Sequence, residues 1–296
     1  MTTVIVGGGS LGLLLTDASM SIGERPYLLV RRKEQMQQLQ QEGLTVVEEG
    51  RVRSVRHLFD VSTDWPKEVS RIIVATKFDA IQELLPQLER INAPTLFIQN
   101  GLAHYERIQK SHLKNVTFAS IEHGAARLTD ASVSHNGIGR LVFPKEASSH
   151  TWGDYMTSSV EHYPVVQVDE DALTILKRKV FMNVLINPLT AIYEIRNGVL
   201  VEEDIYYEKM YELYEELSSV FDEIKQLVPF ETVVKLCKQT SNNHSSMYQD
   251  RQNQKKNEVA TIVTPLINEA HRQGKELPLL EAYERQLHQL NIEGLR

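Results

Sequence analysis

The stretch that decides the fold stands near the start of the chain, where residues 3–12 read TVIVGGGSLG. The apolar run Thr3–Val6 predicts a β-strand, and an apolar helical pattern follows the glycines. Gly7, Gly9 and Gly12 satisfy the spacing G-x-G-x-x-G between the two elements. A strand that leads through this spacing into a helix is the context that a dinucleotide-binding loop requires.

Each glycine in this loop has a physical task. Gly7 permits a tight turn, Gly9 lets the backbone approach a pyrophosphate, and Gly12 lets the helix pack closely on the strand. The first turn of the helix then offers free N–H groups and a partial positive charge to phosphates. The alternative is a structural glycine turn that binds no ligand. We assign the whole loop to the cofactor: Gly7, Gly8, Gly9, Ser10, Leu11 and Gly12.

The second predicted strand is Tyr27–Val30, and the residues that follow it indicate which cofactor the chain binds. An NAD site usually has Asp or Glu about 20 residues after the glycines, where it binds the ribose 2′-hydroxyl. This chain instead has Arg31-Arg32-Lys33, with no acidic residue to repel a 2′-phosphate. A guanidinium binds phosphate through two parallel hydrogen bonds. We therefore predict NADP(H) with Arg31 as its leading contact; the alternative is a solvated basic cluster.

Strand-like and helical patterns alternate through the rest of the first half. Ligands in an open α/β sheet bind beyond the carboxyl ends of the strands, so we place Lys77 and Asn100 beside the cofactor. The alternation predicts βαβ units and a parallel sheet covered on both faces. The further expected strands are Leu44–Glu48 and Val52–Phe59, for which a hairpin stays open, then Arg71–Ala75 and Thr95–Gln99, with Thr117–Ile121 and Leu141–Phe143 extending the sheet; the expected helices are Leu11–Ile22, Lys33–Glu42 and Phe78–Leu88.

From about Asp171 onward the apolar spacing is helical, and Tyr206–Leu227 is expected to form one long helix. The sequence therefore predicts an α/β protein: an N-terminal doubly wound parallel sheet of the Rossmann type and a C-terminal all-α domain. We place the NADP-binding domain at residues 1–168 and the helical substrate domain at residues 169–296. Asp169 or Asp171 is expected to cap the first helix of the second domain.

Composition excludes several classes of protein. The 296 residues carry a formal net charge of -7, whereas a protein that coats nucleic acid needs a basic face. No apolar run approaches the roughly 18 residues that span a bilayer, so we predict no membrane segment. The single cysteine, Cys237, excludes a disulfide within the chain and favours the cytoplasm; we interpret it as a small buried residue rather than a reactive thiol. We assign no metal site.

The stretch KRKVFMNVLINPLTAIYEIRNG, residues 177–198, is the most informative part of the second half. Lys179, Asn183 and Asn187 are spaced i, i+4, i+8, so they share one edge of a helix that is otherwise apolar. Such a polar stripe must find hydrogen-bond partners. Beside a nicotinamide, a lysine with amides can polarise a carbonyl and protonate the alkoxide as hydride arrives. The alternative is a hydrogen-bond network between helices.

Together these residues resemble the ketopantoate reductase (2-dehydropantoate 2-reductase) family over nearly the whole chain. The most specific part is Lys179–Gly198, which contains INPLTAI and closes with Asn197-Gly198. The other matching segments are GGGSLG with Arg31, Lys77, Asn100-Gly101, His135-Asn136-Gly137-Ile138-Gly139, and Asn243–Asp250 followed by Glu258.

The resemblance implies reduction of ketopantoate to pantoate by NADPH, on the route to pantothenate. It implies Lys179 as the general acid and Glu258 as a residue near the cofactor ribose and the lysine. The substrate would be held by Asn183, Asn187, Asn197, Asn243 and Ser246. The sequence does not fix the oligomeric state, and a homodimer is one possibility.

The chain departs from the family around Glu258. The next residues are VATIVTP, where the family commonly has an aromatic residue and an Asn-Gly pair. Before it, Lys256 keeps the basic residue of the family and Asn257 stands where the family usually has Thr. Two other functions therefore stay open: a reductase of another 2-oxo acid or of a 3-hydroxy acid, and a catalytically silent NADP(H)-binding regulator.

Overall fold

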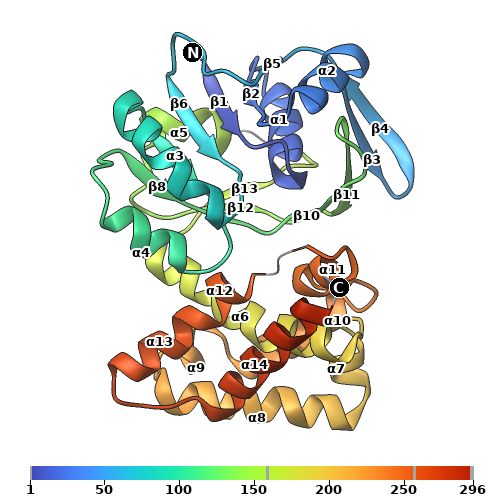
Figure 1. The fold of residues 1–296 in the computed structure, drawn as a ribbon, viewed down its shortest axis with the longest axis vertical. Helices are drawn as coiled ribbons and strands as arrows, with labels where there is room; N and C mark the ends of the chain where they lie inside the picture. Colours follow the sequence, from blue (N-terminus) through green and yellow to red (C-terminus); the bar gives the residue numbers. More distant parts are fainter. Residues whose placement is uncertain (1, 158–159, 256–257, 294–296) are drawn as a thin grey trace. The chain divides into compact units, whose positions relative to one another are not determined.

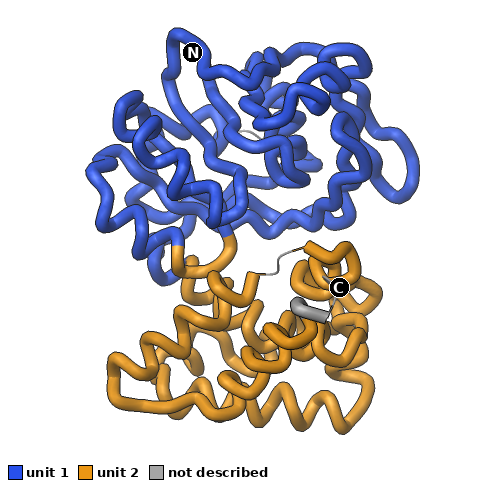
Figure 2. Tube along the Cα trace, in the orientation of Figure 1, with its two compact units in different colours: residues 1–99, 104–175 blue, residues 100–103, 176–296 orange. Residues whose placement is uncertain are grey.

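The computed structural model describes residues 2–157, 160–255 and 258–293. The chain divides into two compact units, which Figure 2 shows in different colours. Unit 1 holds residues 1–99 and 104–175, and unit 2 holds residues 100–103 and 176–296. The short segment 100–103 thus leaves the first unit in the middle of its sequence and belongs to the second.

A six-stranded sheet forms the centre of unit 1, with the strand order β5-β2-β1-β6-β7-β8 and every neighbouring pair parallel (Figure 1). Parallel neighbours need crossover connections, which helices supply here. The sheet confirms the predicted Rossmann-type architecture. Its strands are β1 (Thr3–Val6), β2 (Tyr27–Leu29), β5 (Asp60–Ser62), β6 (Arg71–Val74), β7 (Thr95–Phe97) and β8 (Val116–Phe118); the helices are α1 (Ser10–Ser21), α2 (Lys33–Glu42), α3 (Phe78–Ile91), α4 (Ala103–Gln109) and α5 (Ser149–Met156).

Two smaller sheets correct the prediction for the rest of unit 1. Two runs, Thr117–Ile121 and Leu141–Phe143, are predicted to extend the main sheet, but only β8 joins it. The first run breaks at the buried Ala119, and Leu141–Phe143 belongs to a separate sheet. An apolar run shows that a segment is buried and does not identify its partner strand. A four-stranded sheet contains β10 (Gly124–Arg127), β11 (Ser132–Gly137), β3 (Leu44–Glu48) and β4 (Arg51–Arg56); a three-stranded sheet contains β13 (Val165–Gln167), β12 (Leu141–Phe143) and β9 (Ser120–Ile121).

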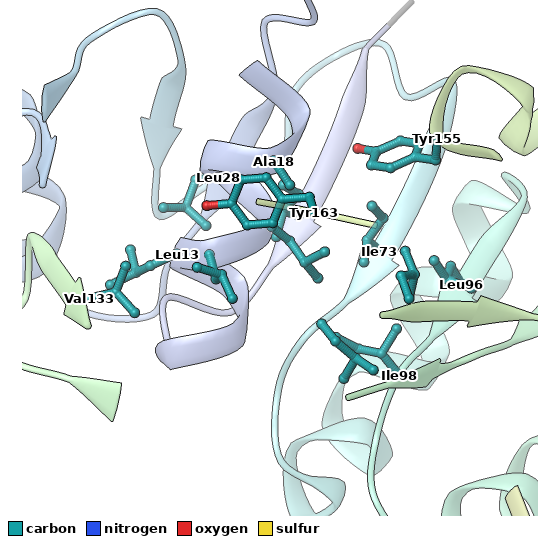
Figure 3. Packing of buried hydrophobic residues seen from close by; sticks show 14 of the residues in the cluster. Leu13, Ala18, Leu28, Ile73, Leu96, Ile98, Val133, Tyr155 and Tyr163 are labelled. Carbon is teal, nitrogen blue, oxygen red and sulfur yellow. The ribbon is translucent and has the colours of Figure 1, made fainter. Parts of the chain in front are cut away.

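Helix α1, which begins at the glycine loop, lies between two sheets and is buried on both sides. It contacts β1 and β2 of the main sheet and β3, β10 and β11 of the four-stranded sheet. Full burial of one leucine contributes about 1.5–3 kcal/mol, so several on one short helix hold it firmly. Figure 3 shows this packing, with Leu13, Ala18, Leu28, Ile73, Leu96 and Val133 among the labelled residues.

Unit 2 contains only helices in its described part, which confirms the predicted all-α region. Helix α6 begins after Asp171, whose carboxylate accepts the backbone N–H of Thr174 at 2.9 Å and so caps the helix; this backbone bond lowers the pKa of Asp171. No helix in the described ranges is long and apolar enough to cross a membrane. The helices are α6 (Ala172–Tyr193), α7 (Val199–Glu202), α8 (Asp204–Val220), α9 (Ile224–Leu227), α10 (Phe230–Gln239), α11 (Ser246–Gln252), α12 (Val259–Ile262), α13 (Thr264–Arg272) and α14 (Pro278–Glu293).

The single long helix predicted for Tyr206–Leu227 is wrong. Helix α8 ends at Val220, and the short helix α9 starts at Ile224. Phe221 takes an extended backbone, with φ −109° and ψ 92°, and its buried ring packs on Phe181 at 5.5 Å between centroids. The aromatic contact with α6 thus decides where α8 ends, and such a contact leaves no trace in the helical periodicity.

Cys237 is fully buried in α10, as expected for a structural residue. Burial raises the pKa of its thiol to about 12, because the apolar surroundings disfavour the thiolate. The thiol is therefore protonated at neutral pH and contributes packing rather than reactivity.

Candidate active site

The glycine loop has the geometry that phosphate binding needs. Gly7 has φ +112°, and a Cβ atom on Gly12 would lie 1.8 Å from the Gly7 carbonyl oxygen, so both positions require glycine. A Cβ on Gly9 would meet no atom within 4 Å, which leaves open space above the loop. Helix α1 starts after Gly9 with no side chain capping it, so first-turn N–H groups are open to an anion.

Gln35 of α2 supports this loop from behind, and sequence reasoning missed it. The side chain is 4% exposed, and its amide nitrogen donates to the Gly8 carbonyl at 2.7 Å and to the Asp130 carbonyl at 3.0 Å. The contact ties the glycine loop to α2 and to the segment before β11. Helix α2 is rich in glutamine and looks exposed in sequence, so nothing distinguished this residue from its neighbours.

The structure separates the two arginines that follow β2. Arg32 forms an ion pair with the carboxylate of Asp130. Arg31 is exposed and forms no ion pair or hydrogen bond with the described residues. Arg31 is therefore the guanidinium with free donors at this strand end. Lys77, also a predicted cofactor contact, is exposed and stands directly before α3.

Asn100 lies in unit 2, where it joins a chain of hydrogen bonds with three other predicted site residues. Its amide nitrogen donates to both carboxylate oxygens of Glu258, each at 3.3 Å. The hydroxyl of Ser246 donates to the same carboxylate at 3.2 Å. Asn187 in turn donates to the Ser246 hydroxyl at 3.4 Å. Four residues from four separate segments are thus brought together around one half-buried carboxylate.

Gly101 fixes Asn100 in this place. Its φ is +89°, and a Cβ atom here would lie 2.0 Å from the carbonyl oxygen of Thr261. The next residue, Leu102, donates its backbone N–H to that same oxygen at 3.1 Å. The segment therefore docks against α12, directly after Glu258, at a distance that only glycine allows.

The polar edge of α6 varies in burial along its length. Lys179 and Asn183 are half-buried, whereas Asn187 is 5% exposed. The amide of Asn183 bonds to none of the described residues, so it is available to a ligand. From Val184 to Ala191 every residue of the helix is buried, and the helix continues through Pro188.

Asn197 and Asn243 meet, but they have different surroundings. Asn243 is exposed, and its carbonyl accepts the backbone N–H of Asn197 at 3.0 Å. The Asn197 side chain is 9% exposed and donates to the Thr240 hydroxyl at 3.0 Å. The geometry therefore makes Asn197 a support for the segment that carries Asn243. Lys256 and Asn257, named from the sequence, lie outside the described residues.

Sequence reasoning also missed a buried pair of hydroxyl groups in this region. Thr190 of α6 and Ser245, the capping residue of α11, form a buried hydrogen bond of 2.7 Å. Thr190 follows Asn187 by three residues, so its position on the same helix edge was a signal that the sequence offered.

The two units together provide two kinds of chemistry. Unit 1 provides a glycine loop that is open at Gly9 and an arginine, Arg31, that bonds to none of the described residues, two features suited to binding phosphate. Unit 2 provides a lysine, two amides, a hydroxyl and a carboxylate around one helix edge, a set suited to binding a carboxylate substrate and moving a proton. In the described ranges no group of three or more metal-binding side chains gathers.

Models of one protein family match most of the chain. Residues 3–147 match the model described as Ketopantoate reductase PanE/ApbA, and residues 171–291 match its C-terminal counterpart. Among curated relatives, the 2-dehydropantoate 2-reductase of Listeria monocytogenes is 32% identical over 289 residues, covering 94% of this chain and 93% of the relative.

Solved structures with the same fold include enzymes of different substrates. A probable 2-dehydropantoate 2-reductase from Bacillus subtilis is 27% identical, with a TM-score of 0.86 over 98% of this chain and 100% of that chain. A D-mandelate dehydrogenase with NADH and anilino(oxo)acetate has a TM-score of 0.85 at 17% identity, with 100% of both chains covered. The second likeness concerns the fold alone.

Replacement of Gly101 by alanine is expected to destabilise the chain by about 2–4 kcal/mol, because strained backbone and the clash with Thr261 add. The matched control is Gly153→Ala in α5, where a Cβ meets no atom within 4 Å; this change should stabilise by about 0.5–1 kcal/mol. Urea unfolding followed by circular dichroism measures both. Equal stability of Gly101→Ala and the unmodified chain would contradict the close contact.

Proposed function

The chain belongs to the ketopantoate reductase family, and on that premise we propose that it reduces 2-dehydropantoate (ketopantoate) to pantoate with NADPH, a step toward pantothenate and coenzyme A. The family consists of NAD(P)-dependent reductases of 2-oxo acids. The observation that carries the proposal is the hydrogen-bonded chain Asn187–Ser246–Glu258–Asn100 beside the helix edge of Lys179.

The cofactor half of the proposal rests on unit 1. The glycine loop would hold the pyrophosphate with first-turn N–H groups of α1, and Arg31 would hold the 2′-phosphate. When bound, NADPH supplies the hydride that reduces the C2 carbonyl of the substrate. Gln35 keeps the loop in shape through its bond to the Gly8 carbonyl. The absence of an acidic residue directly after β2 favours NADPH over NADH, and the pairing of Arg32 with Asp130 leaves Arg31 as the phosphate contact.

The substrate half rests on the helix edge of unit 2. Lys179 would donate a proton to the oxygen at C2, which otherwise develops the charge of an alkoxide. Asn183 and Ser246 would bind the substrate carboxylate and hydroxyl by hydrogen bonds, with Asn187 and Asn243 beside them. Glu258 orients Ser246 by accepting a hydrogen bond from its hydroxyl. Asn100 in turn holds that carboxylate in place through both of its oxygens.

A panel of 2-oxo acids with NADPH oxidation as the readout tests the function. We expect ketopantoate to give the highest kcat/KM. The panel includes phenylglyoxylate, which tests the D-mandelate dehydrogenase alternative that the shared fold raises. A higher kcat/KM for another 2-oxo acid would change the assigned substrate but not the assigned reaction, the reduction of a 2-oxo acid. Cofactor binding with no turnover of any member would favour the silent regulator.

The free donors of Arg31 predict a cofactor preference. NADPH should bind more tightly than NADH by about 1.5–3 kcal/mol, the range for hydrogen bonds to a charged group. Arg31→Ala should remove most of this difference, whereas Arg32→Ala should keep it because Asp130 already pairs Arg32. Titration calorimetry measures the Kd values. Equal affinities in the unmodified chain, or loss of the preference in Arg32→Ala alone, would contradict the assignment.

Replacement of Lys179 by alanine should lower kcat by roughly 10²–10⁴, the scale for loss of a positioned acid, with little change in NADPH affinity. Lys177→Ala is the matched control, since Lys177 lies on the same helix and pairs with Glu223 at 2.8 Å. We expect that control to keep kcat. Steady-state kinetics with the best substrate decide, and a near-normal kcat for Lys179→Ala would remove it from the mechanism.

A further inference from the structure

Two buried hydroxyl groups join α6 to α11 beside the proposed substrate edge. Thr190 lies three residues after Asn187 on α6, and Ser245 immediately precedes Ser246. Thr190 is 0% exposed and Ser245 is 6% exposed. Thr190 Oγ1 lies 2.7 Å from Ser245 Oγ, and it also lies within hydrogen-bond distance of the Ile186 and Asn187 carbonyls of its own helix. Because water reaches neither group, no solvent competes for this bond.

This buried bond does more to fix α11 than the neighbouring hydrogen bond between Asn187 and Ser246. Asn187 Nδ2 lies 3.4 Å from Ser246 Oγ, a long distance, and Ser246 is exposed. Ser245 also accepts the backbone N–H of Tyr248 at 3.1 Å, which caps α11. One serine therefore both starts the helix and attaches it to Thr190, and the position of Ser246 follows from that attachment.

The other end of α11 is attached separately. Arg251 donates to the carbonyl of Ala191 and pairs with the Glu194 carboxylate at 2.6 Å, so it holds α11 at the C-terminal end of α6. Loss of the Thr190 hydroxyl would release the N-terminal end of α11 while Arg251 keeps the helix docked. We therefore expect Ser246 to move without unfolding of α11.

We propose that Thr190 is a positioning residue for the 2-oxo acid: through Ser245 it sets Ser246 within reach of both Asn187 and Glu258. Its kinetic consequence rests on the proposed function, whereas its structural consequence rests on the hydrogen bonds alone. Thr190 is fully buried and acts through Ser245, so it should govern substrate binding and leave cofactor binding unchanged.

The kinetic test compares Thr190→Val, which keeps the branched shape and removes the hydroxyl, with Thr190→Ser, which keeps the hydroxyl. We expect Thr190→Val to raise the KM of the 2-oxo acid about tenfold with a smaller change in kcat and an unchanged NADPH Kd, the effect of one misplaced hydrogen bond. Thr190→Ser should stay within about twofold. Thr95→Val is the matched control, because its hydroxyl is fully buried and donates to the Ala93 carbonyl at 2.9 Å at the start of β7.

Two outcomes overturn the proposal. One is a Thr190→Val variant that has the KM of the unmodified enzyme and only a lower melting temperature, as Thr95→Val should show. The other comes from crystal structures of the unmodified chain and of Thr190→Val, which need no activity. In the variant, Ser246 Oγ should lie beyond hydrogen-bond distance of Asn187 Nδ2. A Ser246 hydroxyl that stays bonded to both Asn187 and Glu258 in the variant refutes the positioning role. Absence of turnover in the unmodified chain would reject the proposed function, and these structures would still decide the positioning role.

Discussion

Polar side chains in the buried stretch of α6 impose the constraint on which the organisation of unit 2 depends. Residues 184–191 are all buried, yet Asn187 and Thr190 are among them. The Thr190 hydroxyl can bond to the Ile186 carbonyl of its own helix at 2.9 Å, but the Asn187 amide finds its partner in Ser246 of α11. Because a buried polar group without a partner costs about 1–3 kcal/mol, the amide requires another segment to meet this helix edge. Helix α11 does so with Ser245 and Ser246. Glu258 accepts a hydrogen bond from the Ser246 hydroxyl, and Asn100 donates to that carboxylate, so both join the same contact.

The same contacts suit a site whose residues must exchange partners. The bond between Asn187 and Ser246 is long, at 3.4 Å, and its Ser246 end is exposed, so a substrate oxygen can replace it at little cost. The bond between Thr190 and Ser245 is short and buried, and it holds the framework during that exchange. Within the proposed function, the bond between Thr190 and Ser245 supports the contact of α6 with α11, and the bond between Asn187 and Ser246 gives way to the substrate.

Unit 1 meets a steric constraint rather than a polar one. The Gly7 carbonyl occupies the place where any side chain on position 12 would begin, so α1 and β1 approach as closely as backbone allows. The burial of α1 between two sheets keeps its first turn in place, and Gln35 holds the loop carbonyl. The result is a supported loop with open space at Gly9, and Arg31, which follows β2, bonds to no other side chain in the described part of the chain.

Local sequence determined what local forces decide. The glycine spacing, the bounds of α2, the cap at Asp171 and the polar edge of α6 could all be predicted, because each depends on backbone sterics or on the period of one helix. Tertiary structure decided the rest: the separate sheet of β9 and β12, the end of α8 at Phe221, and the meeting of Asn100 with Glu258. Periodicity shows which face of an element is buried, but the partner on that face comes from residues distant in the chain, and only packing and hydrogen-bond satisfaction select it.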